Sequence, residues 1–148
     1  MMKVLIACEF SGIVRDAFIL RGHDAVSCDL EPSESPGPHI QGDVTAVLRQ
    51  PFDLVIAHPP CTYLCNSGVR WLKGNEERWG LMREAAAFFN LCLAANAPRV
   101  AVENPVMHGH AGIRKPAFTV QPWQFGDNET KRTCFWTRSP KHLSLIHI

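Results

Sequence analysis

Short apolar runs recur along the chain, and each is too short to form a helix. Runs of four to eight apolar residues that end at turn residues are typical of strands buried on both faces, as in a parallel sheet. Prolines, glycines and polar residues follow each run here. The predicted strands cover residues 3–8 (KVLIAC), 24–29 (DAVSCD), 53–57 (DLVIA) and 99–103 (RVAVE).

Helical spacing of apolar residues separates these strands. After the first run, residues 14–21 have the apolar spacing of a helix that stops at Gly22, and Ser11 is its expected N-cap. A short helix is expected over residues 44–50, and the longest apolar face covers residues 76–96. The order of elements therefore begins as strand, helix, strand.

Strands that alternate with helices favour an α/β fold. Consecutive parallel strands need crossover connections, and the predicted helices supply them. Two later apolar segments, residues 118–121 and 133–137, are joined by a polar loop and predict an antiparallel pair. We therefore expect an α/β fold with a mainly parallel sheet, an antiparallel edge and helices on both faces.

Composition and charge restrict the class of protein. The chain has 148 residues, of which 46% are hydrophobic and 20% are charged, as in one ordinary globular domain. There are 15 lysines and arginines against 14 acidic residues, so the net charge is +1. This balance excludes a protein that binds nucleic acid mainly by neutralising phosphates.

Cysteine content and the N-terminal sequence indicate the compartment. The segment MMKVLIACEF has no apolar signal-peptide region before the first strand, and no apolar run reaches the ~20 residues of a membrane span. We expect a cytoplasmic protein with free thiols and no membrane partner. Of the six cysteines, Cys8, Cys28 and Cys92 are expected to be buried structural residues.

Unusual polar segments follow four of the predicted strands. In an open α/β sheet, ligands bind in the crevice beyond the carboxyl ends of the strands. Each segment alone also has a structural explanation, such as a turn glycine, a solvated acid or a rigid proline turn. Their shared position favours a functional site built from residues 9–12 (EFSG), Asp29, residues 58–61 (HPPC) and residues 103–105 (ENP).

Two of these segments resemble motifs of the cytosine-5 methyltransferases, enzymes that use S-adenosylmethionine. The tripeptide PPC at residues 59–61 looks like the nucleophile motif of that family, and ENPV at residues 103–106 is similar to its Glu-Asn-Val motif. Their order and strand context also match, and residues 115–136 look like the short phage-type members. The resemblance covers residues 3–138 loosely. It implies a Rossmann-like methyltransferase fold and a catalytic domain over residues 1–138.

The resemblance implies methylation of cytosine at C5 in DNA. Cytosine C5 is too weakly nucleophilic to attack a methyl sulfonium directly, so a thiolate must first add to C6, and Cys61 would be that nucleophile. Glu103, followed by Asn104, would protonate or bond N3 and accept a hydrogen bond from the N4 amine. Arg132 lies where the family has an arginine that contacts the base and the sugar-phosphate.

The need for a thiolate makes a prediction about the surroundings of Cys61. A positive neighbour, for which His58 and Arg70 are nearby in the sequence, should lower its pKa. Cys65 is a bystander, a packing residue or an auxiliary thiol. Zinc binding is the alternative for the two thiols, but the spacing differs from that of common zinc sites, and we expect no metal. The four zinc ligands would be Cys61, Cys65, His108 and His110.

The resemblance also implies where S-adenosylmethionine binds. Residues 10–12 match the start of the family's Phe-x-Gly-x-Gly-Gly loop, but Val14 and Arg15 replace its later glycines. A carboxylate after the second strand, with Glu31 in reserve, would bond the ribose hydroxyls, and Asp43 would contact the adenine amine while capping the next helix. The predicted cofactor residues are Phe10, Ser11, Gly12, Asp29, Asp43 and Pro59.

The short chain leaves several roles open. Family members that act on duplex DNA carry a target-recognition region, which this sequence lacks, so a free deoxycytidine nucleotide is an alternative substrate. The missing glycines favour a second alternative, a catalytically impaired fold that acts as a binding protein. The tail at residues 139–148, in which LSLIHI looks foreign, also predicts a truncated chain, whose site self-association into a homodimer could complete.

Overall fold

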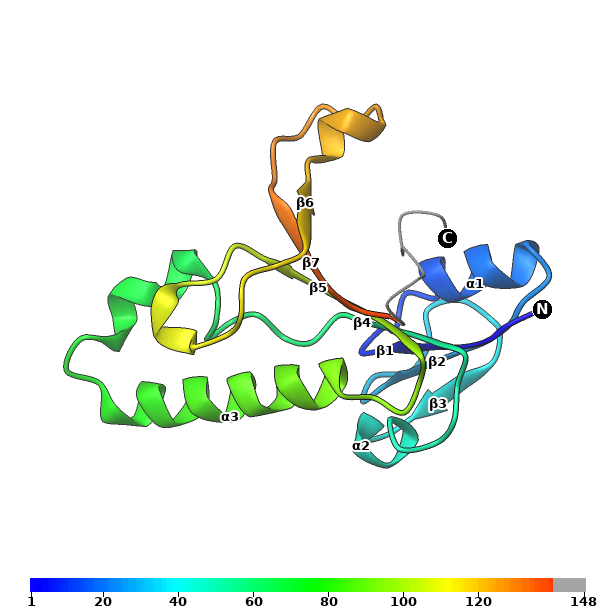
Figure 1. The fold of residues 1–148 in the computed structure, drawn as a ribbon, viewed down its shortest axis with the longest axis horizontal. Coiled ribbons are helices and arrows are strands. Elements are labelled where there is room, and N and C mark those ends of the chain that lie inside the picture. Colours follow the sequence, from blue (N-terminus) through cyan, green and yellow to red (C-terminus); the bar gives the residue numbers. More distant parts are fainter. Residues whose placement is uncertain (140–148) are drawn as a thin grey trace.

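The computed structural model describes residues 1–139, which form one seven-stranded sheet with helices on both faces (Figure 1). The strand order is β3-β2-β1-β4-β5-β7-β6. All of the predicted tail except Ser139 lies outside the described residues. The strands are β1 (Lys3–Ala7), β2 (Asp24–Asp29), β3 (His39–Gln41), β4 (Leu54–Ala57), β5 (Arg99–Pro105), β6 (Phe118–Val120) and β7 (Thr133–Arg138).

The strands from β3 to β5 run parallel, and β7 and β6 add an antiparallel edge. The chain leaves β1 toward β2 on one side and leaves β4 toward β5 on the other. The direction of winding therefore reverses between β1 and β4, and such a reversal opens a crevice at the carboxyl ends of the strands. The predicted mainly parallel sheet with an antiparallel edge is confirmed.

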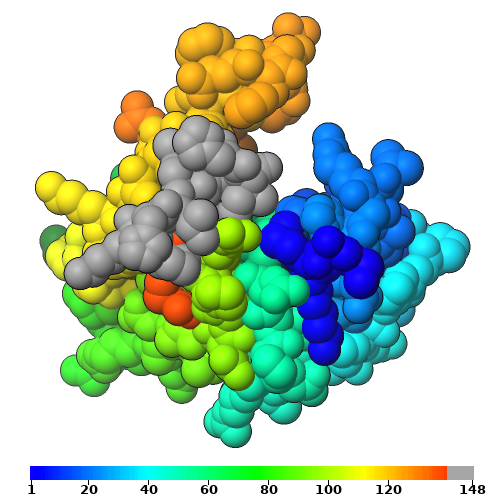
Figure 2. Space-filling model, turned by 45° about the vertical axis from the view of Figure 1, so that its right-hand side comes forward, coloured from blue at the N-terminus to red at the C-terminus, as the bar shows by residue number. Residues whose placement is uncertain are grey.

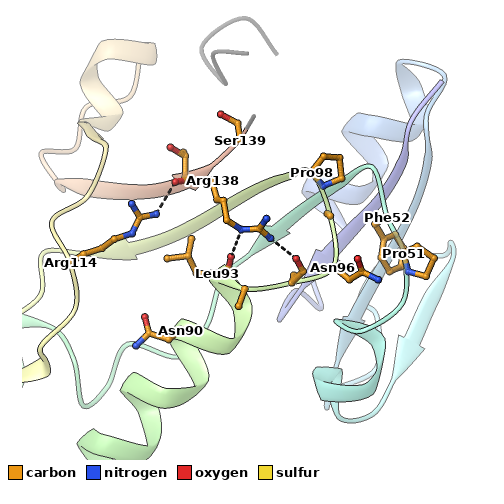
Figure 3. Close-up of a pocket in the computed structure, with 13 residues that line it drawn as sticks. Pro51, Phe52, Asn90, Leu93, Asn96, Pro98, Arg114, Arg138 and Ser139 are labelled. Atoms are coloured by element: carbon orange, nitrogen blue, oxygen red, sulfur yellow. Dashed lines mark hydrogen bonds between the residues drawn. The ribbon is translucent and has the colours of Figure 1, made fainter. Parts of the chain in front are cut away.

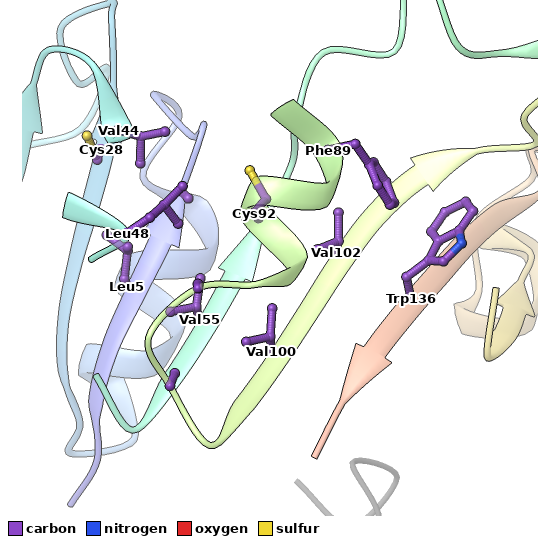
Figure 4. Close-up of a cluster of buried hydrophobic side chains, with 14 of the residues drawn as sticks. Leu5, Cys28, Val44, Leu48, Val55, Phe89, Cys92, Val100, Val102 and Trp136 are labelled. Atoms are coloured by element: carbon purple, nitrogen blue, oxygen red, sulfur yellow. The ribbon is translucent and has the colours of Figure 1, made fainter. Parts of the chain in front are cut away.

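Helices cover the two faces of the sheet unequally. Helix α1 (Ile13–Leu20) packs on one face against apolar side chains of β1 and β4. Helices α2 (Val44–Val47) and α3 (Glu76–Leu93) lie on the other face, over the larger core (Figure 1). There, Phe89 of α3 meets Trp136 of β7 edge to face, with ring centroids 5.0 Å apart (Figure 4). No helix within residues 1–139 has the length and apolar character of a membrane span.

Most predicted boundaries lie within three residues of the observed ones. Strand β2 matches the prediction, whereas α3 ends at Leu93 instead of residue 96. Strand β3 and the 3₁₀ helix η1 (Asn66–Leu72) lie in segments for which no helix or strand was predicted. Strand β3 has only three residues, too few for a hydrophobic pattern, and forms by parallel pairing with β2.

Strands β6 and β7 continue into a hairpin that projects from the body of the molecule, as Figure 1 and Figure 2 show. The 3₁₀ helix η3 (Pro122–Phe125) forms its tip. The side chain of Gln124 accepts a hydrogen bond of 2.7 Å from the backbone N–H of Gln121, and the Gln124 N–H donates to the Gln121 carbonyl. The projecting tip is therefore a hydrogen-bonded turn with a defined conformation.

Candidate functional site

The predicted site segments meet at the carboxyl edge of the sheet, around the reversal of winding. Cys8 follows β1, and its N–H donates to the carbonyl of Cys28 in β2. Its φ of 60° lies in the left-handed region, which non-glycine residues rarely adopt. Backbone conformations of this kind cluster at functional sites. The chain thus turns sharply at the centre of the crevice.

His58 and Glu103 come together from neighbouring strands at this edge. Nδ1 of His58 lies 3.1 Å from Oε2 of Glu103, and both side chains are partly buried. Because a carboxylate only accepts hydrogen bonds, Nδ1 carries the hydrogen of this one. The other ring nitrogen, Nε2, is buried and has no partner among the described residues. The pair holds the Glu103 carboxylate in place through one oxygen and leaves Oε1 for a ligand.

Asn104 joins the end of β5 to the proline loop. Its side-chain Nδ2 donates to the carbonyl of Pro59, at 2.9 Å, and to the carbonyl of Glu103, at 2.8 Å. Asn104 is fully buried, and its Oδ1 has no partner in the part of the chain that the structure describes. One amide therefore fixes the two predicted catalytic segments to each other, although they are 45 residues apart in the sequence.

Cys61 begins a turn directly after the two prolines. Its carbonyl accepts hydrogen bonds from the N–H groups of Leu64 and Cys65, at 3.0 and 3.1 Å. Burial raises the pKa of the Cys61 thiol, and the adjacent Cys65 thiol and the Glu103 carboxylate raise it further. The predicted lowering of this pKa is therefore wrong for the protein without a ligand.

The two predicted activating cations are engaged elsewhere. His58 is hydrogen-bonded to Glu103. The guanidinium of Arg70 stacks on the ring of Trp71, 4.6 Å from its centroid. Proximity in the sequence does not make either residue an activator: neither His58 nor Arg70 is among the groups that shift the pKa of Cys61.

The segment after Cys61 is paired by main-chain hydrogen bonds with the segment after β5. Two histidines of the segment after β5 make further contacts near this pairing. Nε2 of His108 lies 3.0 Å from the carbonyl oxygen of Tyr63, and the ring of His110 lies edge-on to Trp79 with centroids 5.4 Å apart. Within residues 1–139, no three His, Cys, Asp or Glu side chains form a group that could hold a metal ion.

Two cavities open at the carboxyl edge, and Cys8 lines both. The first, here called the acidic cavity, has a volume of about 290 Å³ and lies between β2, α2 and α3. The second, here called the turn cavity, has a volume of about 300 Å³ and lies beside the turn from β1 to α1. Their linings include Cys28, Asp29, Asp43, Pro60 and Phe88 in the first, and Glu9, Phe10, Ser11, Val14 and His58 in the second.

Two carboxylates face the acidic cavity. Asp43 is the N-cap of α2, as predicted, and its Oδ1 accepts a 2.8 Å hydrogen bond from the N–H of Thr45. This hydrogen bond holds the pKa of Asp43 below its ordinary value. Oδ1 of Asp29 accepts from the N–H of Glu31, at 3.0 Å. The cavity thus offers acceptors for hydroxyl and amine groups beside an apolar wall that includes Phe88.

Glu9 organises the turn from β1 to α1. Its carboxylate accepts hydrogen bonds from the Ser11 hydroxyl, at 3.0 Å, and from the N–H groups of Val14 and Arg15, at 2.8 and 3.4 Å. The N-cap position of α1 is Gly12 rather than the predicted Ser11. The Ser11 hydroxyl still accepts from the N–H of Ile13, at 3.2 Å, and the buried Glu9 carboxylate satisfies the next two N–H groups, at the end where the helix dipole favours a negative charge.

Arg15 occupies the place of one of the missing glycines, and its side chain is fully buried. A Cβ atom at Gly12 would lie 2.6 Å from Nη2 of Arg15, and one at Gly37 would lie 2.8 Å from it. Gly12, predicted to contact the cofactor, lines neither cavity and instead makes room for this guanidinium. The guanidinium donates to the hydroxyls of Ser27 and Ser33 and to the carbonyls of Ser35, Pro36 and Pro38.

Five other predicted residues line neither cavity, namely Pro59, Cys61, Glu103, Asn104 and Arg132. Pro59 contributes its carbonyl to Asn104, and its neighbour Pro60 lines the acidic cavity. Arg132 is exposed just before β7, and its position next to the pair formed by Thr133 and Pro105 puts it at the carboxyl edge. Within the described residues, no hydrogen bond or ion pair joins Arg132 to Glu103 or Cys61.

A cavity of about 1230 Å³ lies at the opposite edge of the sheet, between the C-terminal ends of α3 and β7 (Figure 3). Its arginines bond main-chain carbonyls: Arg114 donates to Thr137, and Arg138 donates to Leu93 and Ala95. It contains none of the predicted site residues and borders Ser139, where the described chain ends. The predicted site residues lie at the carboxyl edge instead.

Comparisons with known proteins bear on the fold. No protein-family model matches the chain, and no curated sequence matches it significantly. Among solved structures it is similar to a protein described as a DNA modification methyltransferase, encoded within a prophage of E. coli. The TM-score is 0.53 and the sequence identity 16%, over 91% of this chain and 46% of that one. The chain has a Rossmann-like methyltransferase fold.

A second similar structure is a protein of Thermoplasma acidophilum, with a TM-score of 0.54 and 11% identity over 96% of this chain and 80% of that one. At these identities the likeness concerns the fold alone. The methyltransferase fold predicted from the sequence is confirmed by the strand order and by these comparisons. The chain spans less than half the length of the prophage protein.

Three residues shape the site in ways that were not predicted, although one of them, Glu9, belongs to the predicted segment 9–12. Arg15 had a signal in the sequence, since it is a single cation among the apolar residues of the first helix. Glu9 had a weaker signal, an acid just before the first helical turn. The left-handed backbone of Cys8 had none, because cysteine has no preference for that region.

Proposed function

We propose that this chain is an S-adenosylmethionine-dependent methyltransferase that methylates C5 of cytosine in DNA through a covalent bond between Cys61 and C6 of the base. The observation that carries the proposal is the pair of hydrogen bonds from Asn104, which fixes the Pro59 loop beside Glu103 at the carboxyl edge. The prophage protein of similar fold is described as a DNA modification methyltransferase, and this supports DNA as the substrate.

The walls of the two cavities suit S-adenosylmethionine. Asp29 and Asp43 in the acidic cavity would accept hydrogen bonds from the ribose hydroxyls and the adenine amine, with Phe88 against the ring. The Glu9 carboxylate in the turn cavity would attract the ammonium group of the methionine part, beside Phe10. When bound, the cofactor supplies an electrophilic methyl group on a positively charged sulfur.

Cys61 and Glu103 would have different roles on the base: Cys61 would add to C6, and Glu103 would stabilise the charge that this addition places on the ring. The Cys61 thiolate adds to C6, and the displaced electron pair moves into the ring, where protonation of N3 stabilises it. Oε1 of Glu103, which the bond to His58 leaves available, would carry a proton, give it to N3 as the thiolate adds, and take it back as the thiolate leaves. The N4 amine would donate a hydrogen bond to the same carboxyl group. After methylation, loss of the C5 proton expels the thiolate and restores the C5–C6 double bond.

The raised pKa of Cys61 has a consequence for this mechanism. At neutral pH the thiol of the protein without ligands is protonated, because its pKa is raised by burial and by Cys65. A nearby positive charge favours the thiolate. In the proposal, the nucleophile therefore forms only in the occupied site, which protects it from reaction in the empty protein.

A covalent trap tests the proposal. The protein is incubated with S-adenosylmethionine and 5-fluorodeoxycytidine, offered as the monophosphate, in an unpaired oligonucleotide and in a duplex, and its intact mass is measured. Fluorine at C5 cannot leave as a proton, so the Cys61 adduct should accumulate with DNA. Cys61→Ser should give no adduct, and Cys65→Ser, a matched thiol four residues away, should still give one.

Each alternative has a distinct outcome in the same experiment. An adduct with the monophosphate alone would replace DNA by a free nucleotide as the substrate. The raised pKa of Cys61 and the replacement of the loop glycines favour a binding protein as the second candidate. Cofactor binding by calorimetry without any adduct would establish that candidate, and an adduct that persists in Cys61→Ser would refute the assigned nucleophile.

A further inference from the structure

We infer that the projecting β6–β7 hairpin is a docking surface for an unpaired nucleic-acid strand, on which the rings of Trp123 and Phe125 stack with bases next to the target cytosine. The inference rests on the proposed function and makes its substrate a strand rather than a free nucleotide. It also gives a role to the one element that extends away from the body of the fold (Figure 1).

The hairpin tip displays large aromatic side chains in a fixed conformation. Trp123 is 57% exposed and Phe125 is 77% exposed. Both belong to η3, which is closed by the hydrogen bonds of Gln121 and Gln124. Exposed rings of this size are unfavourable in water, and a rigid tip loses little conformational entropy when a ligand covers them. The tip is therefore suited to bind a flat apolar surface.

A row of side chains runs across the sheet from the candidate active site in β5 to β6, the strand that leads into this tip. Glu103 in β5 is directly opposite Phe135 in β7, and Phe135 is directly opposite Phe118 in β6. Side chains of directly opposed residues lie on the same face of a sheet. The rings of Phe135 and Phe118 stack with centroids 5.0 Å apart and an angle of 14°. A base held at Glu103 would thus have aromatic surface beside it, in the direction of the hairpin.

Two exposed basic residues, Lys131 and Arg132, directly precede β7, between the tip and the carboxyl edge. Two acidic residues of the same loop, Asp127 and Glu129, balance their charge, so residues 118–132 have no net charge. Attraction of a phosphate backbone would therefore come from this local pair of cations, and stacking would supply most of the affinity.

Aromatic platforms with a few adjacent cations favour an unpaired strand. Every base has a π face, and stacking on an aromatic side chain contributes about 1–3 kcal/mol per base. The bases of a duplex already stack on each other, and duplex binding depends on many phosphate contacts, which Lys131 and Arg132 alone do not supply. An unpaired strand also spares the enzyme the cost of extruding the cytosine from a helix.

Binding of fluorescein-labelled oligonucleotides, followed by anisotropy, tests the inference. Wild-type protein should bind an unpaired strand more tightly than a duplex of the same sequence. Removal of either ring, in Trp123→Leu or Phe125→Leu, should weaken binding of the unpaired strand roughly tenfold. The variants Trp123→Phe and Phe125→Tyr, which keep a ring, should retain most of the affinity. Leu20→Ala, at an exposed apolar position on α1, should have no effect.

Several results would overturn the inference. Equal affinity of the leucine variants and the wild type would remove the stacking role, and equal or tighter binding of the duplex would remove the preference for an unpaired strand. Sedimentation that shows loss of self-association in the leucine variants, with strand binding unchanged, would reassign the rings to a contact between copies of the chain. Unpaired RNA is expected to bind as well as unpaired DNA, and an RNA affinity unaffected by loss of the rings would also count against stacking.

The two proposals fail separately. Strand binding that depends on the rings, without any adduct at Cys61, would keep the surface and refute the methylation chemistry. An adduct at Cys61 that forms with wild-type protein and oligonucleotide, at a rate unchanged in the leucine variants, would keep the chemistry and refute the surface.

Discussion

Nδ1 of His58 lies 3.1 Å from Oε2 of Glu103, so the carboxyl group that we propose to activate the base is held by a side chain from the neighbouring strand. Imidazole is the side chain that ordinarily gains and loses its proton near neutral pH, so a change of pH can alter its hydrogen bond to a partner. The pair is surrounded by other titratable groups, namely Glu9 after β1, Cys61 in the proline loop and Cys134 in β7.

We predict that His58→Ala slows formation of the Cys61 adduct roughly 10- to 100-fold, because Glu103 loses the contact that orients it. His58→Asn, whose amide can still donate a hydrogen bond, should retain more of the rate than the alanine variant. Adduct rates are measured by intact mass, and Tm is measured for both variants. A wild-type rate in His58→Ala would exclude a role of His58 through Glu103, and an equal loss of rate and of Tm in both variants would show a structural effect only.

The reactivity of Cys61 toward an alkylating agent should rise with pH. Its pKa is raised, so the thiolate fraction at pH 7 is small and grows about tenfold per pH unit until the pKa is reached. Cys65→Ser removes a group that raises this pKa and should therefore speed alkylation of Cys61 near neutral pH. Iodoacetamide labelling with peptide mass analysis measures both rates. A Cys61 rate that is flat between pH 7 and pH 9 would contradict the direction of the shift.

Asp43 carries two proposed roles that different substitutions separate. Asp43→Ala removes both the N-cap of α2 and the proposed contact with the adenine amine, so it should lower Tm and weaken binding of S-adenosylmethionine. Asp43→Ser keeps a capping oxygen and should restore Tm, but it should leave cofactor affinity reduced by roughly tenfold, the effect of one charge-assisted hydrogen bond. Thermal unfolding and calorimetry measure the two effects, and a wild-type affinity in both variants would exclude the adenine contact.

Arg15→Ala should lower the free energy of unfolding by about 3–5 kcal/mol, because it leaves buried hydroxyls and carbonyls without their donor. Arg15→Lys keeps the charge but cannot serve the same set of acceptors, and should recover only part of the loss. Urea unfolding measures the change. Arg21→Ala is the control: this exposed arginine is the C-cap residue of α1, and its loss should change stability by less than about 0.5 kcal/mol.

The elements of the sheet were predictable because they depend on local pattern. The apolar runs that became β1, β2, β4 and β5 are bounded by residues that cannot continue a strand, and Asp43 caps α2 through its nearest neighbours. Strand β3 was not predictable in this way. Its pairing with β2 follows a loop rich in proline and serine, whose order depends on Arg15 at a distance in the sequence.

The candidate site was predicted in its components but not in its contacts. The strand ends brought residues 58–61 and residues 103–105 together as expected, since parallel strands share a carboxyl edge. The pairing of His58 with Glu103, instead of with Cys61, depends on which face of β4 the imidazole occupies. The pKa of Cys61 depends on burial, which no local pattern reports.

Arg15 also couples Gly12 to Gly37, so that a substitution at one of these positions affects the surroundings of the other. Gly12 and Gly37 each leave the space that its guanidinium fills, and any side chain at either position would collide with it. In related chains, a side chain at position 12 or 37 is therefore expected only where the arginine is replaced by a smaller residue. The φ of 80° at Gly12 favours glycine there in addition, so loss of the arginine should free position 12 less than it frees the space around it.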